Sequence, residues 1–257
     1  MRKIILGDCI KVMEKIKDKS IDMILCDLPY GTTACKWDVV IPFKPLWNQY
    51  ERIIRDKGAI VLFGSQPFTT DLINSNRKWF KYEWIWKKNN PTGIGYANYR
   101  PMLNHENILV FCKNKHLYNK QMRDCANSVK KRWKNGQKEG IKYKKKSEHI
   151  KPITHKKRYK VNPVTVLCFD VSPRSKGTLH PTQKPVALFE YLIKTYTNKN
   201  DIVLDSCAGS GTTGIACINL KRDFILIEKE KKYYKLMKER IVKYIKEIKI
   251  GTDIKRN

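Results

Sequence analysis

Between residues 201 and 228 the sequence alternates apolar runs with a glycine-rich segment, and this pattern restricts the fold more than any other part of the chain. The run DIVLD is typical of a buried strand, GIACINLK of a helix, and FILIE of a second strand. The first strand and the helix are joined by a loop that satisfies G-x-G-x-x-G through Gly209, Gly211 and Gly214. This order predicts an α/β fold whose helix N-terminus faces a nucleotide-like ligand.

The rest of the chain continues the alternation of strand and helix signals. Short apolar runs predict strands, and apolar residues at i, i+3, i+4 and i+7 predict helices. On these criteria we expect strands at 3–8, 21–26, 58–65, 82–87, 106–113, 201–205 and 224–228, and helices at 9–16, 45–54, 186–197, 214–221 and 233–248. Such alternation favours a doubly wound, mostly parallel sheet.

Two acidic residues bear on which ligand the glycine loop binds. Glu228 ends the strand after the loop, where a carboxylate accepts hydrogen bonds from ribose hydroxyls of either NAD or S-adenosylmethionine. Asp205 stands directly before the glycines, where it would repel the pyrophosphate of NAD. S-adenosylmethionine has no phosphate and carries an ammonium and a sulfonium, which a carboxylate attracts. The pair favours S-adenosylmethionine; a strand-to-helix turn without a ligand is the alternative.

A large excess of positive charge is concentrated in the middle of the chain. The 257 residues include 53 Lys and Arg against 24 Asp and Glu, a formal net charge of +29. About 18 of these basic residues and 3 acidic ones fall between Lys113 and Lys160, interleaved with aromatic residues. This arrangement suits phosphate contacts and base stacking, so we expect a nucleic-acid partner. Candidate contacts are Arg123, Arg132, Arg158, Asn135 and Gln137.

The basic segment predicts how the chain is divided. Residues 113–178 lack strong periodicity, and we interpret them as an inserted module rather than a linker. Residues 1–112 and 179–257 carry the strand and helix signals on either side of it. We therefore expect one α/β domain in two halves, separated by a basic insertion.

Cysteine spacing and apolar run lengths indicate the compartment. The eight cysteines form no C-x-x-C pair and several lie in apolar runs, so we expect neither a metal site nor a disulfide framework. The first residues do not form a signal peptide, and no apolar run reaches the length of a membrane span. These features predict a soluble protein in a reducing, cytoplasmic compartment with no membrane partner.

A short polar motif interrupts the apolar strand that ends at Cys26. Asp27, Leu28, Pro29 and Tyr30 resemble the D-P-P-Y motif of DNA amino-methyltransferases. Further segments look like blocks of that family: GDC, DLPYGTTACKWD, LFGSQPF, HPTQKP and LDSCAGSGTT. Their order, with the catalytic motif first and the cofactor loop last, resembles the β-group of N6-adenine/N4-cytosine DNA methyltransferases. The resemblance implies a Rossmann-like methyltransferase fold with a target-recognition module at the basic insertion.

The resemblance also implies a mechanism that explains the residue types. The exocyclic amino nitrogen of adenine or cytosine is a poor nucleophile because its lone pair is delocalised into the ring. Asp27 and the carbonyl of Leu28 would accept its two N–H bonds and localise that lone pair. Pro29 would rigidify the turn, and Tyr30 would stack on a base flipped out of the duplex. Leu28 replaces the usual proline of the family, and the scheme uses only its carbonyl.

The same resemblance assigns residues to the cofactor. Asp8 would reach the adenine of S-adenosylmethionine, and Glu228 its ribose hydroxyls. Near its methionine end would lie Thr182, Gln183 and Lys184. The glycine loop would contribute Asp205, Cys207, Gly209, Gly211 and Thr212.

The sequence therefore predicts a site-specific DNA methyltransferase acting on double-stranded DNA. An acid at the first motif position favours N6 of adenine, with N4 of cytosine as the main alternative. An RNA methyltransferase, an NAD-dependent oxidoreductase and a non-catalytic DNA-binding protein are the remaining rivals, and Asp205 and the intact motif argue against the last two. A homodimer and a restriction endonuclease partner are further expectations.

Overall fold

The computed structural model describes residues 1–33, 35–124, 160–171 and 183–254. The chain divides into a larger unit, Met1–Asn119 with Thr165–Asn257, and a smaller unit, Lys120–Val164. The described part of the smaller unit is an antiparallel pair of short strands, β6 (Arg123–Asp124) and β7 (Lys160–Val161). The expected division of the chain after residues 112 and 178 stays a prediction.

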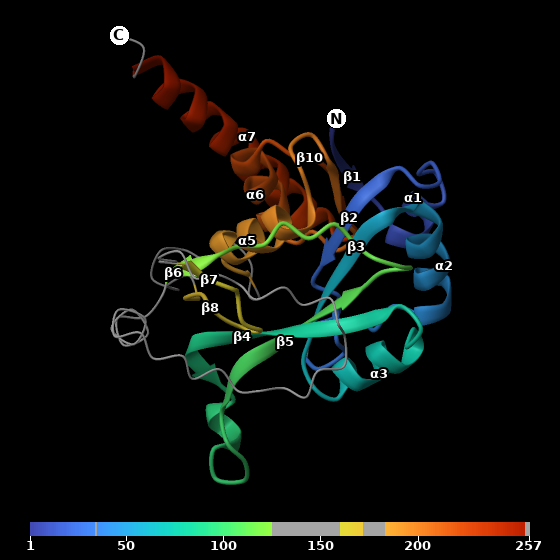
Figure 1. Cartoon of the computed structure of the whole chain (residues 1–257), viewed down its shortest axis with the longest axis vertical. Coiled ribbons are helices and arrows are strands. Elements are labelled where there is room, and N and C mark those ends of the chain that lie inside the picture. The colour runs from blue at the N-terminus through green and yellow to red at the C-terminus, as the bar shows by residue number, and fades with distance from the viewer. Residues whose placement is uncertain (34, 125–159, 172–182, 255–257) are drawn as a thin grey trace, which may run out of the picture. The chain divides into compact units, whose positions relative to one another are not determined.

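One sheet of eight strands forms the centre of the larger unit (Figure 1). The five strands at one side run parallel to their neighbours, while β5 is antiparallel to both β3 and β4. The order across the sheet is β1 (Arg2–Leu6), β10 (Asp223–Glu228), β9 (Ile202–Asp205), β2 (Ile21–Cys26), β3 (Ile54–Gly64), β5 (Leu103–Phe111), β4 (Phe80–Thr92) and β8 (Val166–Cys168).

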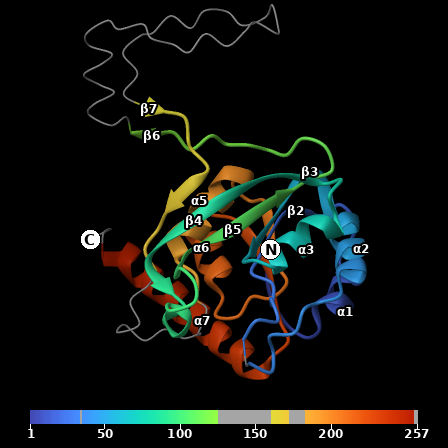
Figure 2. The same cartoon turned by 90° about the horizontal axis from the view of Figure 1, so that it is seen from below.

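Helices cover both faces of this sheet, as Figure 2 shows. On β2, Met23 and Leu25 belong to one buried cluster, whereas Ile24 and Cys26 belong to the other. Alternate side chains of a strand point to opposite faces, so an apolar run without alternation is what a strand buried on both faces requires. The first cluster includes residues of α5 (Val186–Tyr196), α6 (Thr212–Leu220) and α7 (Lys231–Ile254), and the second those of α1 (Cys9–Met13), α2 (Phe43–Ile53) and α3 (Phe68–Ser75).

One α-helix and one strand of the larger unit show no clear sequence signal. Helix α3 is short and begins after Pro67, so its apolar residues do not complete a long helical pattern. Strand β8 buries only Leu167 and leaves its two neighbours exposed, yet it pairs in parallel with β4. A strand with one buried side chain is too short to show apolar periodicity. Residues 113–178 therefore gave no sign of β8 in the sequence.

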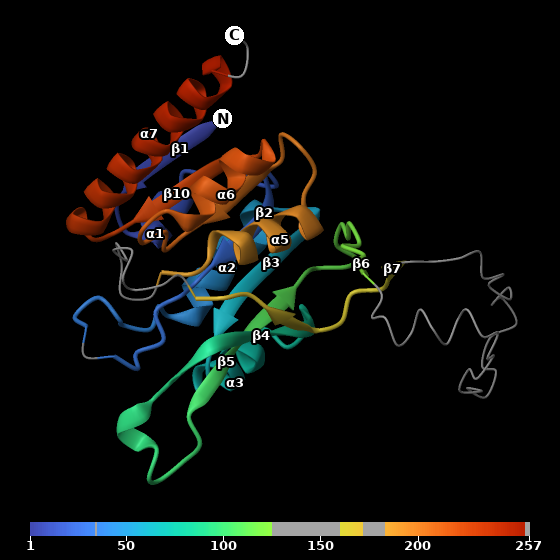
Figure 3. The same cartoon turned by 90° about the vertical axis from the view of Figure 1, so that its left-hand side faces the viewer.

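The hairpin made by β4 and β5 belongs to the sheet at its base and projects from the larger unit at its tip (Figures 1 and 3). Its tip contains a 3₁₀ turn, η1 (Ile94–Tyr96), and exposes the side chains of Ile94, Tyr96 and Tyr99. Lys88 and Glu106 lie at its base, where the two strands are paired. Among the residues that the structure describes, no helix combines the length and apolar character needed to cross a membrane.

Candidate active site

Four acidic residues gather where four parallel strands end. Asp8 and Asp27 follow β1 and β2, while Asp205 and Glu228 are the last residues of β9 and β10. These strands are adjacent, in the order β1-β10-β9-β2, and all are parallel, so their carboxyl ends meet at one edge. In open α/β sheets, ligands bind in the crevice at this edge. Residues from the two ends of the chain therefore converge on one candidate site.

The glycine loop between β9 and α6 is bound to the end of β10. The N–H of Gly209 donates to Oε2 of Glu228 at 2.8 Å, and the N–H of Glu230 donates to Oε1 at 2.8 Å. Gly209 and Gly211 both have positive φ angles, of 51° and 77°. The loop is thus held by the carboxylate expected to contact a ribose, and each of its oxygens retains a lone pair for a ligand hydroxyl.

The later glycines of the loop have a packing role that the sequence did not reveal. A Cβ on Gly211 would lie 2.7 Å from Cγ of Met237, and one on Gly214 would lie 2.8 Å from Cδ1 of Ile241. Both contacts are with side chains of α7. Glycine is therefore required there so that α6 can pack closely against α7.

Asp205 is buried and turned toward the start of α6. Its Oδ1 accepts the N–H of Cys207 at 3.1 Å, and its Oδ2 accepts the hydroxyl of Thr213. Burial raises the pKa of Asp205 to about 7, although both hydrogen bonds oppose the rise. Burial also raises the pKa of Glu228. This edge of the sheet is consequently a place where a cationic ligand would be favoured over an anion.

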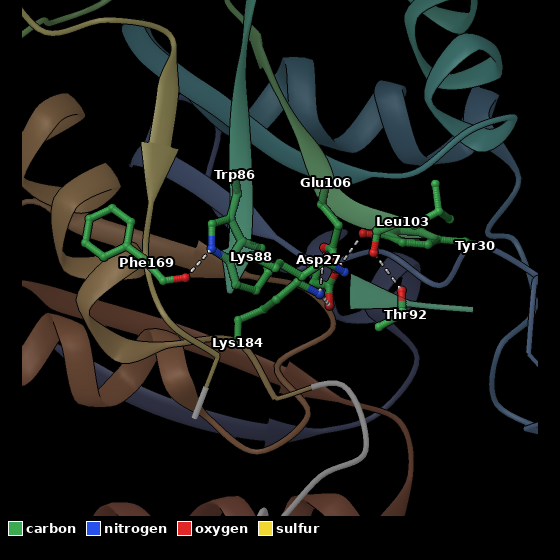
Figure 4. A network of polar contacts seen from close by, with 9 residues as sticks. All are labelled: Asp27, Tyr30, Trp86, Lys88, Thr92, Leu103, Glu106, Phe169 and Lys184. Carbon is green, nitrogen blue, oxygen red and sulfur yellow. Dashed lines mark hydrogen bonds and ion pairs between the residues drawn. The ribbon is translucent and has the colours of Figure 1, made fainter. Parts of the chain in front are cut away.

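Asp27 is the end of a chain of four alternating charges (Figure 4). Nζ of Lys184 lies 2.5 Å from Oδ2 of Asp27 and 3.3 Å from Oε2 of Glu106. Nζ of Lys88 lies 2.9 Å from Oε1 of Glu106. The hydroxyl of Tyr30 donates to Oδ1 of Asp27 at 2.7 Å. Both carboxylate oxygens of Asp27 are thus oriented by hydrogen-bond donors. The four charges of this network, two lysines and two carboxylates, sum to zero.

The surroundings shift the pKa values of these groups in different directions. Burial raises the pKa of Asp27, and Lys184 only partly offsets this effect. For Glu106 the two lysines outweigh burial, so its pKa is lowered. The two carboxylates likewise outweigh burial at Lys184, whose pKa is raised. A lysine that remains charged beside a buried carboxylate favours the ionised form of that carboxylate.

The segment after Asp27 is held by a carboxylate that the sequence did not single out as functional. The two oxygens of Asp38 accept backbone N–H groups at 2.7–3.0 Å from Tyr30, Gly31, Thr32 and Thr33. Although burial acts in the opposite direction, these hydrogen bonds lower the pKa of Asp38. Four donors converging on one side chain determine the path of the loop that carries Tyr30.

Comparison with known proteins agrees with this geometry. Residues 21–239 match the N6/N4 DNA methylase family model, which is most of the chain. The chain belongs to this family. The methyltransferase is 27% identical over 254 residues to the type II methyltransferase M.HpaI of Haemophilus parainfluenzae, a match that covers 93% of this chain and 74% of the relative. It is 28% identical over 250 residues to M1.MboII of Moraxella bovis, covering 88% and 90% of the two chains.

Solved structures show the same fold. The crystal structure of the M1.HpyAVI–SAM complex is 29% identical to this chain, with a TM-score of 0.61 and coverage of 93% of this chain and 100% of that one. The PvuII cytosine-N4-specific DNA methyltransferase is 15% identical, with a TM-score of 0.65 and coverage of 93% and 89%, a likeness of fold alone. The expected Rossmann-like fold, family and DNA methyltransferase activity with S-adenosylmethionine are confirmed.

The residues of the methyltransferase expected at the cofactor lie along one edge, with individual differences. Oδ1 of Asp8 accepts the N–H groups of Ile10 and Lys11 at 3.0 and 3.3 Å, so this carboxylate also caps α1. Oε1 of Gln183 is buried and has no hydrogen-bond partner within the described residues. The adjacent backbone lies beside α6, since Oγ1 of Thr212 is 3.4 Å from the carbonyl of Lys184.

This orphaned oxygen provides a test of whether the site fits S-adenosylmethionine. A buried acceptor without a donor is costly, and a ligand N–H group removes the cost. The cofactor carries an ammonium, and the acidic edge of the methyltransferase suits its positive charge. The residues present therefore fit the cofactor that the family uses.

Leu28 and Tyr30 of the methyltransferase motif DLPY both pack against the fold. The side chain of Leu28 is buried in the cluster beneath α1 and α2, which explains how the chain accommodates it in place of proline. The ring of Tyr30 stacks on Phe68, with centroids 5.0 Å apart and planes at 28°. Phe68, from the LFGSQPF block, supports one face of Tyr30, a contact that the sequence block alone did not reveal. Stacking of the other face on a base stays a prediction.

Of the remaining predicted residues, the structure describes only Arg123. Arg123 belongs to the smaller unit, where its Nε donates to the carbonyl of Asn162 at 2.9 Å. Thr182, Arg132 and Arg158, with Asn135 and Gln137, lie outside the described residues, so their roles stay predictions. Glu106 and Lys88 were missed because a charged residue beside an apolar strand carries no signal of its partner. The sequence shows only that Lys88 follows one apolar run and that Glu106 begins the next.

Proposed function

We propose that this methyltransferase modifies N6 of adenine in double-stranded DNA after the base has been flipped out of the duplex. One contact carries the proposal. Sγ of Cys26 lies 3.2 Å from Oγ of Ser206, so the residue before Asp27 touches the residue after Asp205. The motif that would hold the amino group and the loop that would hold the methyl donor therefore adjoin, as direct transfer between them requires.

Asp27 and the carbonyl of Leu28 would accept the two N–H bonds of the adenine amino group. Their acceptance localises the nitrogen lone pair and stabilises the positive charge that develops on nitrogen during attack. S-adenosylmethionine supplies the electrophilic methyl group on a sulfonium sulfur. The nitrogen would bond to that methyl carbon as the carbon–sulfur bond breaks, with the electron pair staying on sulfur to leave S-adenosylhomocysteine, and the methylated nitrogen would then release one proton to solvent. Tyr30, backed by Phe68, would stack on the flipped ring and keep the nitrogen in line.

The cofactor pocket would be formed by residues that the fold has brought to one edge. Glu228 would accept from the ribose hydroxyls and Asp8 would approach the adenine ring. Oε1 of Gln183 would accept an N–H of the ammonium, because it is buried without a partner among the described residues. The remaining contacts would come from the glycine loop: Asp205, Cys207, Gly209, Gly211 and Thr212.

DNA contact by the insertion completes the proposal. Residues 113–178 would contact phosphates of double-stranded DNA, with Arg123, Arg132 and Arg158 as candidates. A cytoplasmic location, a homodimer and a companion restriction endonuclease belong to the same proposal. The type II designation of M.HpaI and M1.MboII supports the endonuclease partner. Light scattering of the purified protein tests the dimer.

The chemistry is tested by transfer of a labelled methyl group to duplex DNA, followed by digestion and identification of the nucleoside. N6-methyladenine is the expected product. N4-methylcytosine as the only product would overturn the assignment of adenine as the target base. A preference for RNA over duplex DNA would overturn the assignment of duplex DNA as the substrate. Absence of product on varied DNA would overturn the proposed catalysis.

Substitution of Asp27 tests the role of the motif. We expect Asp27→Ala to lower the transfer rate by a factor on the order of 10² to 10³, because one of two acceptors for the amino group is lost. Its dissociation constant for S-adenosylmethionine, measured by calorimetry, should change less than about threefold, since that pocket is held by other residues. Asp71→Ala, at an exposed position of α3, is the control and should retain full activity. Near-normal turnover of Asp27→Ala would contradict the mechanism.

A further inference from the structure

The chain of charges at Asp27 extends beyond the residues that the proposed mechanism uses. We propose that Lys184 and Glu106 are positioning residues for methyl transfer: Lys184 holds Oδ2 of Asp27 with its ammonium, and Glu106 holds that ammonium in place. This inference rests on the proposed function of Asp27. It assigns to Lys184 a partner within the protein rather than the cofactor, and to Glu106 a role in the reaction that its sequence position did not suggest.

The geometry places the ammonium of Lys184 between two carboxylates. It lies 2.5 Å from Oδ2 of Asp27 and 3.3 Å from Oε2 of Glu106, while its side chain is only 8% exposed. Nζ is also 5.3 Å from the centroid of the Phe63 ring, within the range of a cation–π contact. Two anions and an aromatic face surround the group, so it has little freedom to leave Asp27.

The second carboxylate is itself held by a second lysine. Lys88 lies 2.9 Å from Glu106, and their side chains are 10% and 15% exposed. Nζ of Lys88 is 5.7 Å from the ring centroid of Trp86. A buried ion that loses its partner is strongly destabilised, so each member of such a chain keeps the next one in position. Figure 4 shows the four side chains converging from β4, β5, the segment before α5 and the end of β2.

The position of this network beside Asp27 affects the ionisation and the orientation of its carboxylate. To accept an N–H of the target base, this carboxylate must be ionised, yet its burial favours the neutral acid. The ammonium of Lys184 opposes that effect and fixes one oxygen, and Tyr30 fixes the other. Each oxygen retains a further lone pair, now pointing in a set direction, for the base. Orienting an acceptor before the substrate binds increases the rate of the chemical step.

Among the described residues, five groups lie close enough to act on the charge of Asp27, and they differ in sign. Lys184 favours its ionised form, as does the hydroxyl of Tyr30, whereas the negative charge of Glu106 disfavours it. Asp27 also lies within electrostatic range of Asp205 and Cys26. The two proposed positioning residues thus act on Asp27 with opposite charge, which gives them opposite and measurable signatures.

The test is the pH dependence of the single-turnover rate at saturating DNA and S-adenosylmethionine. The acid limb of that profile reports ionisation of Asp27 in the bound complex. For Lys184→Met we expect the limb to move up by about one to three pH units, because the neighbouring cation is lost. For Glu106→Gln we expect it to move down by roughly one unit, because an anion is lost and Lys184 then serves Asp27 alone. At neutral pH the rate of Lys184→Met should fall on the order of 10²-fold.

Controls separate positioning from folding. Lys194→Met on α5 and Glu14→Gln after α1 replace exposed residues of the same types and should leave both the rate and the limb unchanged. Lys184→Arg keeps the charge and should keep the limb within about half a unit of the wild type. If Lys184→Met does not fold, Lys184→Arg and Glu106→Gln together still test whether the limb follows the charges beside Asp27. The cofactor dissociation constant should stay within about threefold in the folded variants.

Limbs that do not move, or that move in the same direction in both variants, would overturn the inference. A large loss of cofactor affinity in Lys184→Met would return that residue to the cofactor pocket. The outcome is distinct from that of the proposed function. The limb can be read from whichever amino group is methylated, so a cytosine product would refute the base assignment and leave this test intact.

Discussion

At Asp205 a single buried carboxylate holds both the turn after β9 and the first turn of α6. Its pKa is about 7 in the folded protein, against an ordinary value of 3.8. A folded-state pKa above the unfolded one means that protonation stabilises the fold. This stabilisation is complete below pH 3.8 and is lost as the pH rises through about 7.

Asp205→Asn should remove that dependence. Between pH 8 and pH 5 the free energy of unfolding of the wild type should rise relative to the variant by roughly 2.5 kcal/mol, because only the wild type takes up a proton at position 205. Urea unfolding without cofactor at several pH values measures the difference. A constant difference across this range would show that Asp205 is already ionised in the fold.

Asp38 offers a second test at the residue scale. Asp38→Asn replaces one acceptor oxygen with an amide group that cannot accept the N–H groups of the loop. We expect DNA methylation to fall by about 10- to 100-fold, since the loop carries Tyr30. Cofactor affinity should remain close to that of the wild type. Asp56→Asn, on the exposed surface, is the matched control, and equal activity of both variants would contradict the anchoring role.

These residues show what could be inferred from sequence at this scale. Asp27 and Tyr30 could be proposed from the sequence because their spacing forms a motif. The role of Asp38 could not, because a carboxylate that accepts backbone N–H groups leaves no pattern in the identities of its donors. Glu106 and Lys184 are far apart in the chain, and only the folded sheet brings them together.

At the scale of elements, the contact between α6 and α7 depends on the absence of a side chain. Gly211→Ala would place a Cβ 2.7 Å from Met237 and would also strain a residue whose φ is +77°. We expect a loss of about 1–3 kcal/mol in the free energy of unfolding, measured in urea. Gly95→Ala, in the η1 turn with nothing within 4 Å, is the control and should change stability by less than about 0.5 kcal/mol. Equal losses would exclude packing as the cause.

Element prediction succeeded where burial is extensive, either along a whole strand or along one face of a helix. The central strands are continuous apolar runs and the helices present one apolar stripe, so their existence could be read from the chain. Their ends were less certain: β3 begins at Ile54, ahead of the expected strand at 58–65, and β4 extends to Thr92. These extensions are mostly exposed, and exposed strand residues carry no apolar signal.

At the scale of the whole molecule, the formal net charge of +29 dominates encounters with a polyanion. We expect the DNA association constant to fall with salt, with log K linear in log salt concentration and a slope of about −0.9 per phosphate contacted. If Arg123 contacts a phosphate, Arg123→Ala should reduce the slope by roughly 1. Fluorescence anisotropy measures the DNA affinity, and the cofactor affinity, which should depend weakly on salt, is the control. A salt-independent DNA affinity would contradict electrostatic binding.

The order of strands in the sheet could not be read from the chain. Periodicity indicates that a strand exists but not which strand lies beside it. The placement of β9 and β10 between β1 and β2 follows from packing across the whole unit. The motif resemblance implied that the catalytic and cofactor segments meet, but the pairing of β2 with β9 supplies the register at which they do so.

That strand order also has a consequence for synthesis on the ribosome. The strands β1 and β2 emerge well before their neighbours β10 and β9. Until then β1 has no partner in the sheet, and the strand that leads to Asp27 lacks its neighbour on one side. A chain whose translation is interrupted after β5 carries the catalytic motif without the cofactor loop. Such a fragment lacks the loop proposed to bind the cofactor, so we expect enzymatic competence only after β9 and β10 have been translated.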